Sequence, residues 1–251
     1  MKKWSAFTAI FFTGYLAFLV ATMPLALLIN NIELPKNLNM GSVSGSVWQG
    51  EISQISANNY TIEKITTELS FWSLLLFSPT IDVSFGEAML AGAEGKFTLT
   101  LSAEQLLLKD VELFVSANDI AKQLTLPIPV TAQGNVELTL AELNLNTSEK
   151  MACEYGQGQI SWLQSGVTAL DNHIKSGTIK ADIDCDKGDL RANISAKNDL
   201  GLSFIARLSI AKQKASGQGY LKPGANFPTE LESALPFLGR PDNQGRYPLK
   251  F

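Results

Sequence analysis

The chain has 251 residues and a mass of 27.2 kDa, a length that allows one large domain or two small ones. Hydrophobic residues make up 45% of it and charged residues 18%, which is too apolar and too weakly charged for an intrinsically disordered protein. The single histidine excludes metal sites that need two, and the net charge of −4 argues against a nucleic-acid-binding surface.

The N-terminal part of the chain has the character of a membrane anchor. Residues 4–32 contain no charged residue, and we expect one transmembrane helix over 6–29, long enough at about 1.5 Å per residue to cross the hydrocarbon core. Lys2 and Lys3 precede it, so residues 1–5 are expected in the cytoplasm. A cleaved signal peptide is the alternative, but the apolar run is longer than such a peptide requires and no clean small-x-small site follows it.

The remaining chain, residues 33–251, is then expected to lie in the periplasm. Without Lys2 and Lys3 its net charge changes from −4 to −6. Its first two tryptophans are Trp48 in GSVSGSVWQG and Trp72 in ELSFWSLLLF, and we expect both to fill the core unless one face of a sheet stays uncovered. Residues 73–78, SLLLFS, predict either a short helix or a buried strand.

The middle of the chain alternates between apolar and polar residues, which indicates strands at 97–101, 111–115 and 136–145. The alternation changes parity at Ala141, which indicates either a β-bulge or a turn between two strands. ANDIAKQL at 117–124 favours one or two helical turns. The two prolines and the glycine of 125–134 mark a candidate boundary between two β subdomains.

The clearest pattern in the sequence is a meander of three strands. Residues 178–185 and 190–197 alternate between apolar and polar, residues 202–210 carry apolar residues at every second position, and turn sequences at 186–189 and 198–201 separate the three. The fold class predicted is therefore mainly β: one N-terminal transmembrane helix followed by an antiparallel β sandwich or an open curved sheet.

Two cysteines, Cys153 and Cys185, lie in the part expected to be exported. An even number of cysteines in an oxidising compartment favours one disulfide, and two separate free thiols are the alternative. We find no enzyme signature: His173 stands alone in a polar turn, and no G-x-S-x-G motif precedes it. The sequence therefore predicts no catalytic residue, no cofactor and no metal.

The carboxylates Asp182, Asp184 and Asp186 have the spacing of a calcium loop. A calcium-binding EF-hand needs a glycine after the third acid and a glutamate at position twelve, and Lys187 and Asn193 stand there instead. We interpret the three as a solvated strand face that leads into a turn.

Three segments carry a family resemblance: GSVSGSVWQG at 41–50, ELSFWSLLLF at 68–77, and ALPFLGRPDNQGRYPLKF at 234–251. With the lysine-flanked N-terminal span, they make the chain similar to the N subunit of the bacterial type II secretion system. The most specific elements are Gly45, Val47, Trp48 and Gly50 in the first segment, and L-G-R-P-D-x-x-G-R-Y-P-L from Leu238 to Leu249 in the last.

The resemblance implies a non-catalytic accessory component in the inner membrane of a Gram-negative bacterium. The machinery moves folded proteins from the periplasm across the outer membrane, so the implied partners are other secretion subunits, either inner-membrane components or the outer-membrane secretin. By fold analogy alone, the β domain looks similar to AsmA-like periplasmic proteins, whose curved sheets shield lipid.

The C-terminal tail is predicted to be a docking element. Arg240 and Pro241 open a turn, and residues 246–251 return as a strand. Pro248 cannot donate a hydrogen bond, so this strand is expected at a sheet edge, where a partner's strand can add. The candidate docking residues are Trp48, Arg240, Pro241, Asp242, Gly245, Arg246, Tyr247 and Phe251.

Two other functions remain open from the sequence. A membrane-anchored periplasmic groove that binds or transports lipid would need a continuous apolar sheet face. An outer-membrane barrel is favoured by the alternation of Tyr247, Leu249 and Phe251 toward the end of the chain. The long uncharged anchor and Pro248 in the last strand argue against the barrel.

Overall fold

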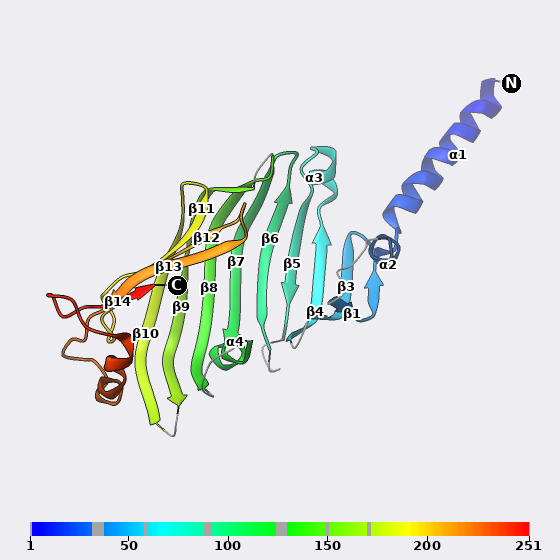
Figure 1. Ribbon diagram of the computed structural model, residues 1–251. Helices are drawn as coiled ribbons and strands as arrows, with labels where there is room; N and C mark the ends of the chain where they lie inside the picture. Colours follow the sequence, from blue (N-terminus) through cyan, green and yellow to red (C-terminus); the bar gives the residue numbers. More distant parts are fainter. Residues whose placement is uncertain are drawn as a thin grey trace.

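The computed structural model describes residues 2–31, 38–57, 60–87, 92–123, 130–148, 151–169 and 172–250. Figure 1 shows an N-terminal helix that projects from one end of a long, twisted sheet. The helices are α1 (Lys2–Ala21), α2 (Leu25–Ile29), α3 (Phe71–Leu75), α4 (Ala117–Gln123) and the 3-10 helix η1 (Thr229–Leu238).

The strands of the described residues form one antiparallel sheet of 14 strands, in the order β1-β3-β4 and then consecutively to β14, with β2 on β3. Their bounds are β1 (Leu38–Met40), β2 (Val43–Gly45), β3 (Gln49–Ala57), β4 (Tyr60–Leu69), β5 (Thr80–Phe85), β6 (Glu94–Leu101), β7 (Gln105–Ser116), β8 (Val130–Asn146), β9 (Ala152–Ala169), β10 (Asn172–Asp186), β11 (Asp189–Ile194), β12 (Leu202–Ser209), β13 (Lys214–Leu221) and β14 (Tyr247–Lys250). The mainly β class is confirmed, and of the two architectures expected the structure has the single open sheet.

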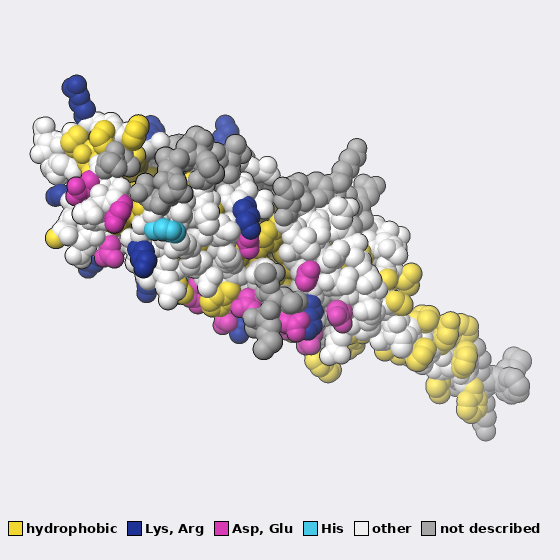
Figure 2. Space-filling view, turned by 90° about the horizontal axis from the view of Figure 1, so that it is seen from below, with side chains coloured by type: hydrophobic (Ala, Val, Ile, Leu, Met, Phe, Trp, Pro, Cys, Tyr) yellow, Lys and Arg dark blue, Asp and Glu magenta, His cyan; other side chains and the backbone are white. Residues whose placement is uncertain are grey.

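The N-terminal apolar segment is two helices rather than one. α1 ends at Ala21 and α2 begins at Leu25, because Pro24 between them has no N–H to continue the helical ladder. Within the described part of the chain, no helix combines the length and the apolarity that crossing a bilayer requires. Side chains along α1 are apolar and largely exposed, including Phe7, Ile10, Phe11, Phe12, Leu16 and Phe18. Figure 2 shows hydrophobic side chains uncovered along this helix.

Strand register gathers the apolar residues on one face of the sheet, because side chains alternate between the two faces of a strand. One apolar row crosses β4 to β8 through Leu69, Ile81, Leu99, Leu108 and Leu143. A second row crosses β7 to β12 through Leu113, Leu138, Ile160, Ala181, Ile194 and Phe204. The opposite face carries cross-strand ion pairs, among them Lys96–Glu112 at 3.1 Å.

The local predictions from alternation are confirmed. The expected meander is β10, β11 and β12. The parity change at Ala141 is a bulge, since β8 shifts register against β9 between Leu140 and Glu142 and continues as one strand. α3 and α4 occupy the two short segments for which helical turns were considered.

The core lies where the C-terminal strands curl toward the centre of the sheet (Figure 1). Leu140, Leu143, Cys153 and Ile183 form the buried cluster, and Leu190 and Ile210, from the far side of the curl, pack against it. Cys153 and Cys185 form a disulfide across the neighbouring strands β9 and β10, with their Cα atoms 5.4 Å apart.

Several expected boundaries fall outside the described residues. These are residue 33, where the β domain was expected to begin, and the first half of the candidate boundary at 125–134, residues 125–129. The described part of that boundary, from Val130, belongs to β8, which pairs with β7 on one side and β9 on the other.

Candidate functional site

The helical segment is joined to the sheet through Trp48. In a continuous helix the carbonyl of Val20 would accept the N–H of residue 24, but residue 24 is a proline and has none. The indole Nε1–H of Trp48 donates to this carbonyl at 2.9 Å. The backbone N–H of Met23 also donates to this carbonyl, at 3.4 Å, so Trp48 supplies the shorter of its two hydrogen bonds in place of the N–H that Pro24 lacks.

The adjoining backbone strengthens the same joint. The N–H of Val47 donates to the carbonyl of Met23 at 2.9 Å, and Ser46 forms a β-bridge with Pro24. Gly50 packs against Leu25 so closely that a Cβ on Gly50 would overlap the Leu25 side chain. The 41–50 motif thus holds the end of the N-terminal helical segment against the first strands.

An aromatic cluster extends from this joint to α3. The rings of Trp48 and Phe71 are 5.3 Å apart and the rings of Phe71 and Trp72 are 5.8 Å apart, both edge to face. Trp48 is half-buried, but Trp72 is 72% exposed, so the expectation that Trp72 fills the core is wrong. The reason is its position on α3, which lies beyond the end of β4 rather than over the sheet (Figure 1).

Substituting Trp48→Phe is expected to weaken the joint by about 1 kcal/mol, because the ring stays against Phe71 while the donor to Val20 is lost. The Val47 amide, which donates to Met23, should then exchange its hydrogen about fivefold faster. Hydrogen-exchange measurements on the two proteins check this, with the exposed Trp72→Phe as the matched control. Unchanged Val47 exchange in Trp48→Phe would contradict the role given to the indole.

The C-terminal motif folds into a loop organised by Asp242. Its carboxylate accepts the backbone N–H groups of Gln244 at 2.8 Å and Arg246 at 2.9 Å, and the Arg246 guanidinium donates to it as well. Gly245 has a φ of 72°, the left-handed conformation that closes this turn. The other face of Arg246 is covered by the Tyr220 ring, with Cζ 5.0 Å from the ring centre.

The tail then returns as β14, as the sequence predicted. β14 pairs with β13 and stands at the end of the strand order, with Pro248 opposite Tyr220. Phe251 lies outside the described residues. The predicted edge position is confirmed, while a docking role for it stays a prediction.

Acid is expected to loosen the Asp242 loop. The Arg246 backbone N–H, followed by the Arg246 side chain, holds the pKa of Asp242 below its usual value of 3.8. The carboxylate's contribution to stability is therefore complete above about pH 4 and is lost as the pH falls through the lower folded-state pKa.

An NMR titration of the Asp242 carboxyl carbon checks that prediction. Arg246→Gln is the informative variant, because it removes the guanidinium but keeps the backbone donor, so the pKa should return only part of the way. Titration of wild-type Asp242 at or above its usual value would contradict the assignment.

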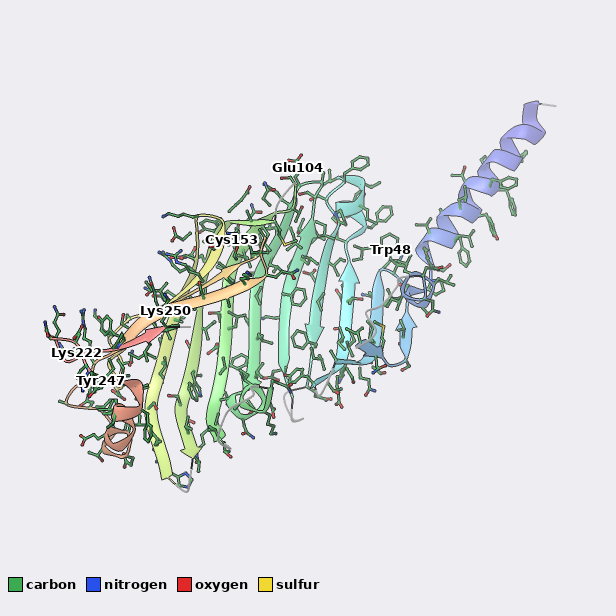
Figure 3. The ribbon with its side chains drawn as sticks, in the orientation of Figure 1. Trp48, Glu104, Cys153, Lys222, Tyr247 and Lys250 are labelled. Carbon is green, nitrogen blue, oxygen red and sulfur yellow. A yellow bond between two sulfur atoms is a disulfide. The ribbon has the colours of Figure 1, made fainter. Side chains whose placement is uncertain are left out.

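The candidate docking residues do not form one site. Trp48 lies beside the base of α1, whereas Tyr247 and Lys250 lie at the opposite end of the sheet (Figure 3). The sequence could not show that Trp48 and the tail are far apart, because the distance between them is decided by the order of the strands in the sheet.

Sequence reasoning also missed the exposed segment from Phe71 to Phe77. The absence of charged residues from 69 to 81 was a signal that could have indicated it.

Two of the three aspartates of β10, Asp184 and Asp186, are more tightly paired than the solvated face we expected, while Asp182 accepts a hydrogen bond from the Gln159 amide at 3.1 Å. Arg191 contacts Asp184 at 2.5 Å and Asp186 at 3.7 Å, and Arg207 contacts Asp186 at 2.5 Å. The hydrogen bond from Arg207 holds the pKa of Asp186 below its usual value. These pairs join β10, β11 and β12 across the polar face.

His173 has hydroxyl and amide neighbours. Its Nδ1 lies 2.7 Å from Oγ1 of Thr168 and 3.3 Å from Nε2 of Gln133. These contacts link the ends of β8, β9 and β10.

Comparison with known proteins places nearly all of the chain in one family. Residues 36–250 match the family described as type II secretion system (T2SS), protein N. The type II secretion system protein N of Aeromonas hydrophila is 27% identical, over 100% of this chain and 98% of its own length. The protein of the same name from Vibrio cholerae is 24% identical, over 99% and 97%. No solved structure matches the chain significantly.

Proposed function

The chain belongs to the type II secretion system protein N family, and from this premise we propose that it is a non-catalytic accessory component of that machinery, anchored in the inner membrane. Its sheet lies in the periplasm of a Gram-negative bacterium and supports the export of folded proteins across the outer membrane. The family match over residues 36–250, which includes every strand described, is the observation that carries this proposal.

The anchoring part of the proposal rests on the N-terminal segment. α1 exposes a succession of large apolar side chains for which the described part of the sheet offers little cover, and burying them in lipid would remove that apolar area from water. Lys2 and Lys3 at its start favour a cytoplasmic N-terminus, which places α2 and the sheet on the periplasmic side.

The partner-binding part rests on the tail. The Asp242 loop presents Arg240 and Pro241 at the end of the sheet farthest from α1, and β14 is an edge strand. Pro248 has no N–H, so it limits how many backbone hydrogen bonds an added strand can form. We therefore expect the loop side chains to contribute to partner binding along with the free edge.

In-cell cross-linking of a tagged full-length protein, followed by mass spectrometry, tests the proposal. Recovery of inner-membrane secretion subunits or of the secretin, and loss of exported proteins from the medium when the gene is deleted, are the expected results. Deleting residues 240–251 should abolish the cross-links if the tail is the docking element. The double substitution Lys96→Ala and Glu112→Ala, far from the tail on the polar face, is the control.

Lipid binding is the second candidate function. The two apolar rows run across the sheet without a charged residue, and several of their side chains are only half-buried, such as Leu69, Leu108 and Phe204. Lipid that co-purifies with the protein in native mass spectrometry, without any secretion subunit above background in the cross-links, would favour this candidate instead.

A further inference from the structure

We propose that α3 and the residues that follow it to Phe77 insert into the periplasmic leaflet of the inner membrane beside α1, as a second membrane contact. This segment, Phe71–Phe77, is called the α3 tip below. The inference rests on the proposed anchoring of α1. A second contact would fix the orientation of the sheet edge relative to the membrane. The single helix α1, joined to the sheet at Pro24, does not fix that orientation by itself.

The composition of the α3 tip is that of a lipid-facing segment. Its sequence is FWSLLLF, and residues 69–81 around it contain no charged residue. Leu76 and Phe77 are 77% and 90% exposed, while Trp72 supplies an indole of the kind enriched at membrane interfaces. An exposed apolar patch of this kind marks an interaction surface rather than a core.

Hydrogen bonding within the tip suits it to a water-poor environment. The backbone N–H groups of Leu76, Phe77 and Ser78 donate to carbonyls of Trp72, Leu74 and Ser73. The Ser73 hydroxyl donates to the Ser70 carbonyl at 2.6 Å and accepts the Thr80 N–H at 2.8 Å. Polar groups that are already hydrogen-bonded within a segment keep their partners when the segment leaves water and enters lipid.

The position of the tip relative to α1 follows from the contact between Phe71 and Trp48. An open hollow of about 650 Å³ separates α1 from the aromatic cluster, and it is lined by five residues of α1 between Thr13 and Ala21 together with Trp48 and Phe71. If this last part of α1 lies in the periplasmic leaflet, then Trp48 and Phe71 lie at the same depth beside it. Lipid acyl chains are the occupant that fits, because the hollow is open and its lining is almost entirely apolar.

The depth of insertion is limited by the neighbouring hairpin. Figure 3 shows Glu104, in the turn between β6 and β7, near the same end of the sheet as α3. A carboxylate there is costly to bury, so the tip enters only the interfacial zone, about 5–10 Å deep as for other interfacial segments. Figure 1 agrees with this geometry, since α3 lies at the ends of β4 and β5 toward which α1 extends.

A labelled cysteine at the tip tests the inference in the full-length chain. Both native cysteines are in the disulfide, so under non-reducing conditions an environment-sensitive fluorophore reacts only with the introduced residue. Phe77→Cys is the test site and Phe237→Cys the matched control, because both phenylalanines are 90% exposed and Phe237 lies on η1, remote from α1.

The probe is a proteoliposome of phosphatidylethanolamine and phosphatidylglycerol with and without spin-labelled acyl chains. The label at residue 77 should lose about half of its emission or more to the quenching lipid, as an interfacial position does, while the label at 237 should change little. If the protein resists alkaline extraction but both labels are quenched equally and weakly, the inference is overturned and the proposed anchoring of α1 is still supported. Release of the protein by alkaline extraction would overturn both.

A photo-cross-linker at Leu76 in living cells separates lipid from a protein partner. Adducts with phospholipid support the inference. A single protein adduct at this site, in place of lipid, would overturn it.

Discussion

Replacing both Cys153 and Cys185 by alanine is expected to lower the free energy of unfolding by about 3–4 kcal/mol. The bridge closes a loop across a sequence separation of 32, and a cross-link of that length removes this much loop entropy from the unfolded chain. The decrease in the free energy of unfolding should lie at the upper end of this range, because Cys153 is also a buried member of the core cluster.

Thermal unfolding monitored by circular dichroism measures the effect. For a protein of this size the melting temperature should fall by about 7–15 °C. Adding a reductant provides the control: it should lower the melting temperature of the wild type toward that of the variant and leave the variant unchanged. A variant that melts with the oxidised wild type would contradict a stabilising disulfide.

Leu140→Ala is expected to cost about 3 kcal/mol, because it opens a cavity at the centre of the core. Leu140 is 7% exposed, and its neighbour on β9 is Gly158. A Cβ on Gly158 would overlap the Leu140 side chain, so the leucine fills the space that the glycine leaves. Gly158 has no side chain that can move into the cavity, and collapse of the site would need backbone movement.

Leu208→Ala is the matched control, since the chemical change is the same but Leu208 is 43% exposed. Its cost should stay below about 1 kcal/mol. Denaturant unfolding of the two variants compares them directly. Equal destabilisation would mean that the strand curl, which brings Leu190 and Ile210 onto the cluster that contains Leu140, does not form the core in solution.

Local patterns in the sequence predicted local structure well. Alternation over 178–210 predicted three successive strands, and the parity change at Ala141 predicted an irregularity that the structure shows to be a bulge. Both signals depend only on which face of a strand a side chain occupies, and this is set by neighbouring residues. The edge position of β14 followed in the same way from Pro248, whose missing N–H is a property of the residue itself.

Some long-range pairs were within reach of the sequence and others were not. The turn at Lys187–Gly188 sets Asp184 opposite Arg191, so that ion pair could have been predicted from the hairpin register. The pair between Asp186 and Arg207 needs the register of a third strand as well. The exposure of Trp72 could not be predicted from its residue type, because a tryptophan after a strand suits a core and an interface equally.

The sequence by itself determined the β class, the strand alternation, the apolar N-terminal segment and the family. Only the tertiary structure decided that the strands form one open sheet, that the Trp48 indole donates to the Val20 carbonyl next to Pro24, and that the tail lies at the opposite end from that joint. The difference has a physical cause. Side-chain alternation and proline geometry act within a few residues, whereas the contact between Trp48 and Val20 joins residues 28 apart through strand order and packing, which no local pattern encodes.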